Sequence, residues 1–294
     1  MKTIAVTGGS GFVGQRLLEC DKDIFRLQQI DLRHTPIASV DVSQADAVIH
    51  LAGKAHQMSP IDDKVYFEVN YELTKQLADQ AKKSGVKQFV FVSTVKVYGD
   101  ELPGMLNETS PCNPTDAYGD SKFRAEQYLQ SIETSVFRIA IIRPPMVYGP
   151  RVKGNMIRLL QLADKNIPLP FGKSGNARSM VFVDNLVALI NAIVLKEAAG
   201  VFIAGDIAPV STDRLLTLIR KHLGNTKGLI SVPGICRKLI KQLTPALYLR
   251  LFGSFIIDNS TTNQKLDFTP PFSTDYGVQQ MVKWFRESRP TSNN

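Results

Sequence analysis

Cysteine is scarce in this chain, and long apolar runs are absent. Only Cys20, Cys112 and Cys236 occur among the 294 residues, and no two of them form a C-x-x-C pair. A sparse, odd set argues against a disulfide framework and is typical of a reducing compartment. No apolar run approaches the roughly 20 residues that span a bilayer, and no charged and apolar leader precedes the strand expected at residues 3–7. We therefore expect a cytoplasmic protein without stable membrane insertion.

The sequence also lacks the patterns of nucleic-acid-binding and metal-binding proteins. It has no basic run interleaved with aromatic residues and no zinc-ligand spacing, so we expect no nucleic-acid partner and no metal. Lysine and arginine total 35 against 27 aspartates and glutamates, which gives a net charge of +8. This excess favours an acidic ligand such as a nucleotide diphosphate.

The first two-thirds of the chain alternates short β-branched runs with helical patterns, as parallel α/β sheets do. Helical patterns occur over residues 12–20, 65–84 and 117–133, and the crossover between Asp31 and Asp46 is too short for a full helix. Several strand candidates are apolar almost throughout, which is expected where helices cover both faces of a sheet. The strand candidates are residues 3–7, 26–30, 46–51, 88–93 and 136–142.

After about residue 150 the pattern loosens. A strand is expected at 180–183, a helix over 184–197, another sheet strand at 201–204 and an amphipathic helix near 274–287. We predict an α/β fold, a doubly wound parallel sheet with a smaller, mostly helical C-terminal lobe. The first domain spans residues 1–150 and is rejoined by about 180–207, and the second comprises 151–179 and 208–294.

A glycine-rich segment, Thr7-Gly8-Gly9-Ser10-Gly11-Phe12-Val13-Gly14, follows the first expected strand and opens the first expected helix. In this context the spacing indicates a Rossmann-type dinucleotide site, because glycine allows the tight turn and a close approach of the pyrophosphate to the helix N-terminus. We expect contacts with the cofactor from Gly8, Gly11, Phe12, Val13 and Gly14.

The end of the second strand bears on the choice of cofactor. Asp31 can accept hydrogen bonds from both ribose hydroxyls and would repel a 2′-phosphate, which favours NAD over NADP. Arg33 weakens this preference, because a guanidinium can pair with a 2′-phosphate. Asp41 and Val42 are candidates for contact with adenine, and a plain surface aspartate is the alternative reading of Asp41.

Tyr118 and Lys122 lie one helical turn apart, on the same face of a predicted helix. A phenol with a pKa of about 10 is a poor base at neutral pH. The charges of Lys122 and of an oxidised nicotinamide favour the phenolate, which can then take a proton from a substrate hydroxyl as hydride leaves the same carbon. Thr94, just after the fourth strand, is placed to hold the substrate oxygen.

These motifs resemble the extended short-chain dehydrogenase/reductase family, the NAD-dependent nucleotide-sugar epimerases and dehydratases, over nearly the whole chain. The resemblance implies Thr94, Tyr118 and Lys122 as the catalytic triad. The motifs, beside the glycine segment and Tyr118–Lys122, are His50-Leu51-Ala52-Gly53, Phe91-Val92-Ser93-Thr94-Val95-Lys96-Val97-Tyr98-Gly99 and Arg143-Pro144-Pro145-Met146-Val147-Tyr148-Gly149-Pro150.

The resemblance also implies roles for single residues. Leu51, Ala52 and Gly53 would line the cofactor site, and Asn70 matches an asparagine that braces its nicotinamide end. Lys54 would lie at the mouth of the site. In the C-terminal lobe, which binds the sugar nucleotide in this family, Asn155 and Arg178 match residues at the diphosphate. A helix-capping role for Asn155 and a surface position for Arg178 are the alternatives.

Two positions discriminate among the reactions of the family. The similar 4,6-dehydratases carry an Asp-Glu acid–base pair directly after the catalytic threonine, whereas this chain has Val95 and Lys96. Because valine transfers no proton, dehydration is rejected. Cys112 lies before Tyr118 rather than beside Thr94, so 3,5-epimerisation lacks support too. What remains is a UDP-hexose or UDP-2-acetamido-hexose 4-epimerase, which we favour, or a 4-ketoreductase of surface-polysaccharide sugars; a non-catalytic dinucleotide sensor is remote.

The remaining expectations concern assembly. Helices near 65–84 and 117–133 resemble those of a four-helix dimer interface in this family, although core packing would use the same apolar spacing. We therefore expect a homodimer.

Residues 229–256 combine apolar and basic residues, and both a membrane-facing amphipathic helix and a helix of the second lobe fit that pattern.

Overall fold

The structure, a computed structural model, consists of two compact units. The first comprises Met1–Pro145, Asp184–Ala204 and Asp258–Thr269, and the second Met146–Val183, Gly205–Ile257 and Pro270–Asn294. The described residues are 1–55, 62–99, 104–231, 233–234, 242–244, 248 and 252–289.

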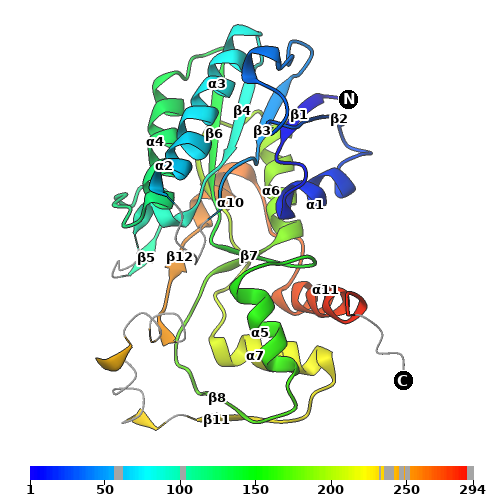
Figure 1. Ribbon diagram of the computed structural model, residues 1–294, viewed down its shortest axis with the longest axis vertical. Coiled ribbons are helices and arrows are strands. Elements are labelled where there is room, and N and C mark those ends of the chain that lie inside the picture. Colours follow the sequence, from blue (N-terminus) through cyan, green and yellow to red (C-terminus); the bar gives the residue numbers. More distant parts are fainter. Residues whose placement is uncertain are drawn as a thin grey trace. The chain divides into compact units, whose positions relative to one another are not determined.

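A parallel six-stranded sheet forms the centre of the first unit, in the order β10-β6-β4-β3-β1-β2 (Figure 1). The predicted α/β fold with a doubly wound sheet is confirmed. Its strands are β1 (Thr3–Thr7), β2 (Arg26–Ile30), β3 (Ala47–His50), β4 (Gln88–Val92), β6 (Arg138–Arg143) and β10 (Gly200–Ile203), and a short β5 (Met105–Leu106) lies apart. Its helices are α1 (Phe12–Cys20), η1 (Ile37–Ser39), α2 (Asp63–Tyr66), the π-helical turn η2 (Phe67–Glu72), α3 (Leu73–Lys83), η3 (Val95–Tyr98), α4 (Ala117–Ser131), α6 (Val183–Leu195) and α10 (Ser260–Leu266).

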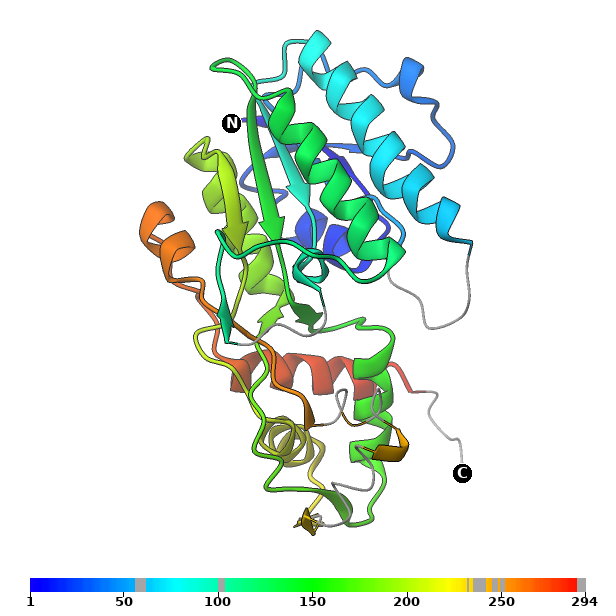
Figure 2. The ribbon, with the colours of Figure 1, turned by 90° about the vertical axis from the view of Figure 1, so that its left-hand side faces the viewer.

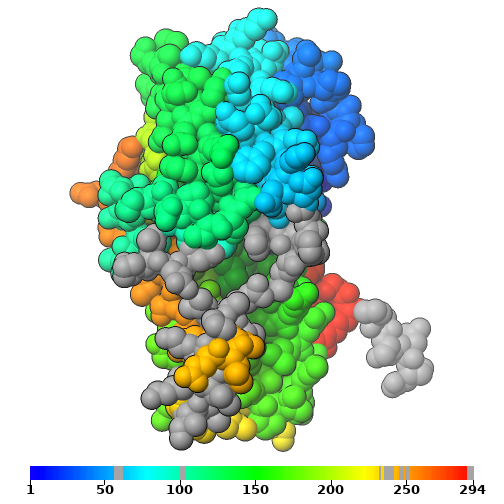
Figure 3. Space-filling view, turned by 60° about the vertical axis from the view of Figure 1, so that its left-hand side comes forward, coloured from blue at the N-terminus to red at the C-terminus, as the bar shows by residue number. Residues whose placement is uncertain are grey.

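Helices cover both faces of this sheet. Leu77 of α3 and Leu129 of α4 are buried against Phe89, Phe91 and neighbouring strand residues. The two helices lie side by side on this face (Figure 1, Figure 3). On the other side α1 and α6 are joined by the Arg16–Asp184 ion pair, whose Nε–Oδ1 distance is 2.6 Å. Strands β1, β3, β4 and β6 are therefore buried at nearly every position, as their apolar runs predict, whereas the edge strand β2 is mostly exposed.

The strand order reverses between β1 and β3. From β1 the chain proceeds outward to β2, then crosses back to β3 through residues 31–46, where the only helix is the single 3₁₀ turn η1. The abbreviated crossover predicted from the sequence is confirmed. Ligands of open α/β sheets bind at the carboxyl ends of the strands beside such a reversal.

The second unit contains helices and short strands (Figure 2). Strand β7 pairs with β9 and β8 with β11, and α7 packs against both α5 and α11. The buried Arg220 guanidinium donates to backbone carbonyls on either side of it, including Ile167 O (2.6 Å) and Lys227 O (2.6 Å). The elements are β7 (Met146–Tyr148), α5 (Asn155–Asp164), β8 (Leu169–Gly172), β9 (Met180–Phe182), α7 (Thr212–Leu223), β11 (Leu229–Ser231), β12 (Ile256–Ile257) and α11 (Thr274–Glu287).

One return of the chain to the first unit was not indicated by the sequence pattern. Residues 258–269 belong to that unit, although the sequence assigns them to the second lobe. Thr262 holds this segment, because its hydroxyl accepts a hydrogen bond from Ile203 N (2.8 Å) and donates one to Glu108 Oε1 (2.5 Å).

The basic segment at 229–256 is described only in part. Its first three residues form β11, while Arg237, Lys238, Lys241 and Arg250 lie outside the described residues. Within the part of the chain that the structure describes, no helix has the length and apolar character needed to cross a bilayer.

A buried carboxyl group in the first unit carries a pH-dependent stability prediction. Asp21, after α1, accepts a hydrogen bond from Asn191 Nδ2 (2.7 Å), and its Oδ2 has no partner among the described residues. Burial raises the pKa of Asp21 to about 6. Because the folded-state pKa is raised, the stabilisation is present at acidic pH and is lost as pH rises towards 6.

We expect Asp21→Asn to raise the free energy of unfolding at pH 7.5 by roughly 2–3 kcal/mol. At pH 4.5 the gain should be much smaller, because the carboxyl group is then protonated in the fold. Denaturant titrations at both pH values measure this, with exposed Asp23→Asn as the matched control. An equal gain at both pH values would contradict the assignment.

Candidate functional site

The glycine loop closes tightly against the end of β3. Gly8 has a φ of +73°, and a Cβ there would lie 2.4 Å from Ala52 N. A Cβ on Gly14 would lie 2.2 Å from Gly8 O. Gly11 N donates to Gly8 O (2.9 Å) and Gly11 precedes α1, whose first turn contains Phe12 and Val13. At Gly8, Gly11 and Gly14 the loop is thus bare backbone, and the start of α1 offers N–H groups to an anion.

The carboxylate at the end of β2 is held by its neighbours. Asp31 accepts hydrogen bonds from His34 Nδ1 (2.9 Å) and from the backbone N–H of Arg33 (3.1 Å). These bonds, His34's above all, lower the pKa of Asp31 to about 2. The Arg33 guanidinium also reaches the glycine loop, where Nη2 donates to Ser10 Oγ (3.1 Å). An ionised Asp31 therefore stands at the rim of the loop, with Arg33 bridging the two.

The two adenine candidates are placed differently from one another. Asp41 is exposed, and its carboxylate accepts a hydrogen bond from Ser43 N (2.9 Å). Val42 is fully buried in the core beneath α3 and α4. The Val42 side chain is therefore core packing, and only its backbone remains available to a ligand.

The segment after β3 is fastened by Asn70. Asn70 lies in the π-helical turn η2, is fully buried, and binds both backbone groups of Lys54: Oδ1 accepts from Lys54 N (2.8 Å) and Nδ2 donates to Lys54 O (3.1 Å). Leu51 N donates to Thr7 O (3.2 Å), which joins the segment to β1. A Cβ on Gly53 would lie 3.1 Å from Lys122 Nζ. π-helical turns often mark functional sites, and the Asn70 amide of this one bonds to the backbone of Lys54 and to Ser121 Oγ.

The three predicted catalytic residues come together. Thr94, directly before η3, and Tyr118, in the first turn of α4, are hydrogen-bonded through their side chains. Lys122 is buried one turn further along α4, donates to Val92 O (3.0 Å) and lies 4.5 Å from the centre of the Phe91 ring. Thr94 follows the carboxyl end of β4, as the sequence predicts, and Tyr118 and Lys122 are joined to that end through Thr94 and Val92 O.

Burial acts against the charged forms of both ionisable members. It raises the pKa of Tyr118 to about 12, although the hydrogen bond with Thr94 opposes the shift. It lowers the pKa of Lys122 to about 8, with the Glu126 charge opposing. The protein by itself therefore keeps the phenol protonated at neutral pH, and a further positive charge beside it is needed to stabilise the phenolate.

The residues after Thr94 have a structural role. Val95 is buried, and Lys96 Nζ lies 3.1 Å from Asp116 Oδ2. Asp116 caps α4 by accepting a hydrogen bond from Gly119 N (2.7 Å). Lys96 thus helps to fix the start of the helix that carries Tyr118. Asp116 was missed from the sequence, yet an aspartate just before a predicted helix is a recognisable capping signal.

Asn155 and Arg178 belong to the second unit. Asn155 is exposed and is the first residue of α5, while Gly154 occupies the capping position without a side-chain bond. The structure therefore does not use Asn155 as the cap that the alternative reading proposed. Arg178 is partly buried, and its backbone exchanges two hydrogen bonds with Val210, both 2.9 Å long. Burial lowers the pKa of the Arg178 guanidinium.

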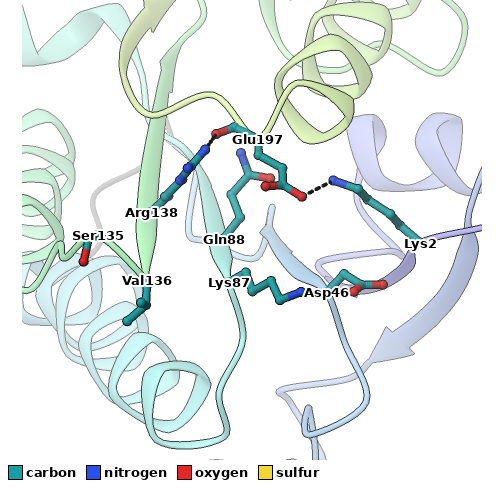
Figure 4. Close-up of a pocket in the computed structure, with 8 residues that line it drawn as sticks. All are labelled: Lys2, Asp46, Lys87, Gln88, Ser135, Val136, Arg138 and Glu197. Atoms are coloured by element: carbon teal, nitrogen blue, oxygen red, sulfur yellow. Dashed lines mark hydrogen bonds and ion pairs between the residues drawn. The ribbon is translucent and has the colours of Figure 1, made fainter.

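A small pocket of about 200 Å³ lies elsewhere, at the amino ends of the strands (Figure 4). Its charges are largely satisfied within the pocket: Lys2 pairs with Glu197 (2.9 Å), and Arg138 donates to the backbone carbonyl of Glu197 (3.0 Å). Asp46 accepts a hydrogen bond from Thr3 N (2.8 Å). Because the glycine loop and Tyr118 stand at the carboxyl ends, this pocket is not part of the candidate site.

Comparisons with known proteins agree with this geometry. A model described as the NAD dependent epimerase/dehydratase family matches residues 4–205. UDP-glucose 4-epimerase of Vibrio cholerae is 34% identical, with 98% of this chain and 96% of the relative covered. N-acetyl-alpha-D-glucosaminyl-diphospho-ditrans,octacis-undecaprenol 4-epimerase of Escherichia coli O157:H7 is 26% identical, with 96% and 94% covered. The fold matches UDP-glucuronic acid 4-epimerase from Bacillus cereus in complex with NAD, with a TM-score of 0.76, 21% identity, and 97% and 99% covered.

The glycine cradle gives a direct test of dinucleotide binding. Gly14→Ala places a methyl group against a backbone carbonyl that cannot move aside, so we expect the affinity for NADH to fall at least tenfold. Gly228→Ala is the matched control, because no atom lies within 4 Å of a Cβ there. Titration of nicotinamide fluorescence measures both, and unchanged affinity in Gly14→Ala would show that the ligand does not enter the loop.

Proposed function

Since the chain belongs to the NAD dependent epimerase/dehydratase family, we propose that it is an NAD-dependent 4-epimerase of a UDP-hexose or UDP-2-acetamido-hexose. The observation that carries this proposal is the hydrogen-bonded pair Thr94–Tyr118 one helical turn from the buried Lys122. The similarity to a UDP-glucose 4-epimerase over nearly the full length of both chains supports the choice of reaction.

Each catalytic residue has one task in this reaction. Tyr118 takes the proton from the C4 hydroxyl during oxidation and returns it during reduction. Thr94 holds the same oxygen, and Lys122 stabilises the phenolate by its charge. NAD, when bound, supplies the acceptor and donor of the C4 hydride. Its cationic ring is also the additional positive charge that Tyr118 lacks in the protein alone.

The cofactor residues follow from the cradle. The backbone of Gly8, Gly11 and Gly14 leaves room for a pyrophosphate at the start of α1. Asp31, kept ionised by its neighbours, accepts the ribose hydroxyls, so NAD is preferred over NADP. The Arg33 guanidinium bonds to Asp31 (Nε, 3.3 Å) and Ser10 (Nη2, 3.1 Å) but is still 68% exposed, so the preference for NAD depends on Asp31.

The substrate residues and the assembly rest on sequence resemblance, and the location rests on the composition of the sequence. We assign Lys54 to the mouth of the site and Asn155 and Arg178 to the diphosphate. We also infer a cytoplasmic homodimer formed through the helices near residues 65–84 and 117–133. Leu77, an apolar residue of the first of these helices, is fully buried within the subunit, so a dimer would use the outward residues of the two helices.

Dehydration is not proposed, although dTDP-glucose 4,6-dehydratases such as that of Streptomyces griseus (27% identical) are also similar to the chain. Elimination of water requires one acid and one base after the catalytic threonine. Val95 has no ionisable group, and Lys96 is paired with Asp116.

The deciding experiment uses purified protein with UDP-galactose or UDP-N-acetylgalactosamine and no added cofactor. Proton NMR should show the C4 epimer accumulating, because an epimerase regenerates its NAD in each turnover. Folded protein that binds NADH but converts neither sugar would favour the 4-ketoreductase, which consumes NAD(P)H once per turnover.

Removal of the phenol hydroxyl tests the base. We expect Tyr118→Phe to lower kcat by about 10²–10⁴-fold, the usual contribution of a general acid–base, with NADH binding retained. Tyr128→Phe on the same helix is the matched control, because its hydroxyl bonds only to Asp79 in the structure. Full activity of Tyr118→Phe would show that Tyr118 is not the general base.

A further inference from the structure

Beneath the candidate site runs a line of buried polar residues, in which Thr74 is joined to Asn70 through the main-chain carbonyl of Asn70. Thr7, His50, Thr74, Asn70 and Ser121 are each fully buried. Thr7 Oγ1 lies 2.6 Å from His50 Nδ1, and His50 Nε2 lies 2.9 Å from Thr74 Oγ1. Thr7 directly precedes the glycine loop, whereas Ser121 stands between Tyr118 and Lys122 on α4. The line therefore connects the cofactor loop with the catalytic helix.

The partners fix the direction of every bond in this line. Thr74 Oγ1 donates its one proton to Asn70 O (2.8 Å), so it must accept the bond from His50 Nε2–H. Nδ1 is then unprotonated and accepts a hydrogen bond from the Thr7 hydroxyl. The Thr7 oxygen in turn accepts a hydrogen bond from Ala52 N (3.4 Å). Only a neutral imidazole protonated on Nε2 satisfies both hydroxyl groups. Burial and the nearby Lys122 charge lower the pKa of His50 to about 3, in agreement with this form.

At its far end the line reaches the catalytic residues. Asn70 Nδ2 donates to Ser121 Oγ (3.1 Å), and Ser121 Oγ donates to Tyr118 O (2.9 Å). The same Asn70 holds both backbone groups of Lys54. A displacement of Thr74 or Asn70 would therefore be transmitted to Tyr118 and to the segment after β3.

We propose that His50 is a positioning residue that fixes the catalytic helix in register with the glycine loop, through Thr7 on one side and Thr74 and Asn70 on the other. This inference rests on the proposed epimerase function. It adds a residue that touches neither substrate nor cofactor. Stability alone does not require a histidine here, because replacing a buried polar group together with its partners by apolar groups of the same shape can be nearly neutral.

The protonation state is tested first, without any activity. The chain has 4 histidines, so nitrogen-15 NMR of the imidazoles resolves them individually. We expect one histidine to remain neutral and protonated on Nε2 from pH 5 to pH 8, and His50→Gln to remove that signal. A His50 that titrates near pH 6.5, or is protonated on Nδ1, would overturn the proposal.

The coupling is tested at Thr74. Thr74→Val keeps the shape but removes the acceptor of His50 and the donor to Asn70. We expect kcat to fall about tenfold or more, with KM changed less than threefold. Because Lys122 and Tyr118 are displaced, the pH at which kcat is half-maximal should also increase by at least one pH unit. Thr74→Ser should restore both.

Thr262→Val is the matched control, because Thr262 is another buried threonine, on α10. Thr262→Val should lower the melting temperature about as much as Thr74→Val does, but it should leave kcat and the pH profile of kcat unchanged. Thr74→Val that loses stability alone, with the wild-type pH profile, would show that the line is only structural.

Failure of the proposed function is separable from failure of this inference. If the wild-type protein converts no UDP-sugar, the imidazole spectra and the affinity for NADH still test whether His50 positions the catalytic helix. We then expect Thr74→Val to weaken NADH binding about fivefold and Thr262→Val to leave it unchanged. Equal affinity in the two variants would contradict the coupling.

Discussion

A buried ion pair holds the frame on which the site is built. Arg143, at the end of β6, donates from Nη2 to Glu126 of α4 (2.6 Å) and from Nη1 to the Tyr98 hydroxyl of η3 (2.9 Å). Both charged side chains are almost completely buried. Such a pair adds little net stability, but loss of one partner typically costs about 3–5 kcal/mol, because the other charge is left uncompensated. It therefore fixes α4 against the ends of the strands, and Lys122 lies one turn from Glu126 on that helix.

The strand reversal then decides where chemistry can occur. Because β1 and β3 are neighbours, the glycine loop after β1 and the segment after β3 touch, as Gly8 and Ala52 do. The next strand outward, β4, carries Thr94 just beyond its end, beside α4. The glycine loop, the segment after β3 and Thr94 with Tyr118 are thus consecutive along the carboxyl edge of the sheet. The His50 side chain, at the end of β3, bonds to Thr7 of β1 and to Thr74 of α3.

The elements with periodic sequence were predictable, and the contacts between distant residues were not. Residues 12–20 and 274–287 have the bounds of α1 and α11, because apolar spacing with a glycine or serine just before the first turn marks a helix locally. The triad followed from local motifs as well. The π-helical turn around Asn70 has no such signature. The role of His50 depends on partners 43 and 24 residues away, and Glu126 reveals its role only when folding brings Arg143 to it.

Because the site is buried, Tyr118 can act as a base only when an additional positive charge lies beside it. The surroundings that exclude water from Tyr118 raise its pKa to about 12, and they lower that of Lys122 to about 8. In the protein alone neither shift favours a phenolate beside an ammonium group at neutral pH. A bound nicotinamide would supply the missing positive charge in its oxidised form only, so Tyr118 would be stabilised as phenolate beside the oxidised ring and not beside the reduced one. The low dielectric of a well-packed site thus ties the protonation of Tyr118 to the redox state of its cofactor, which is what a reversible epimerisation at one carbon requires.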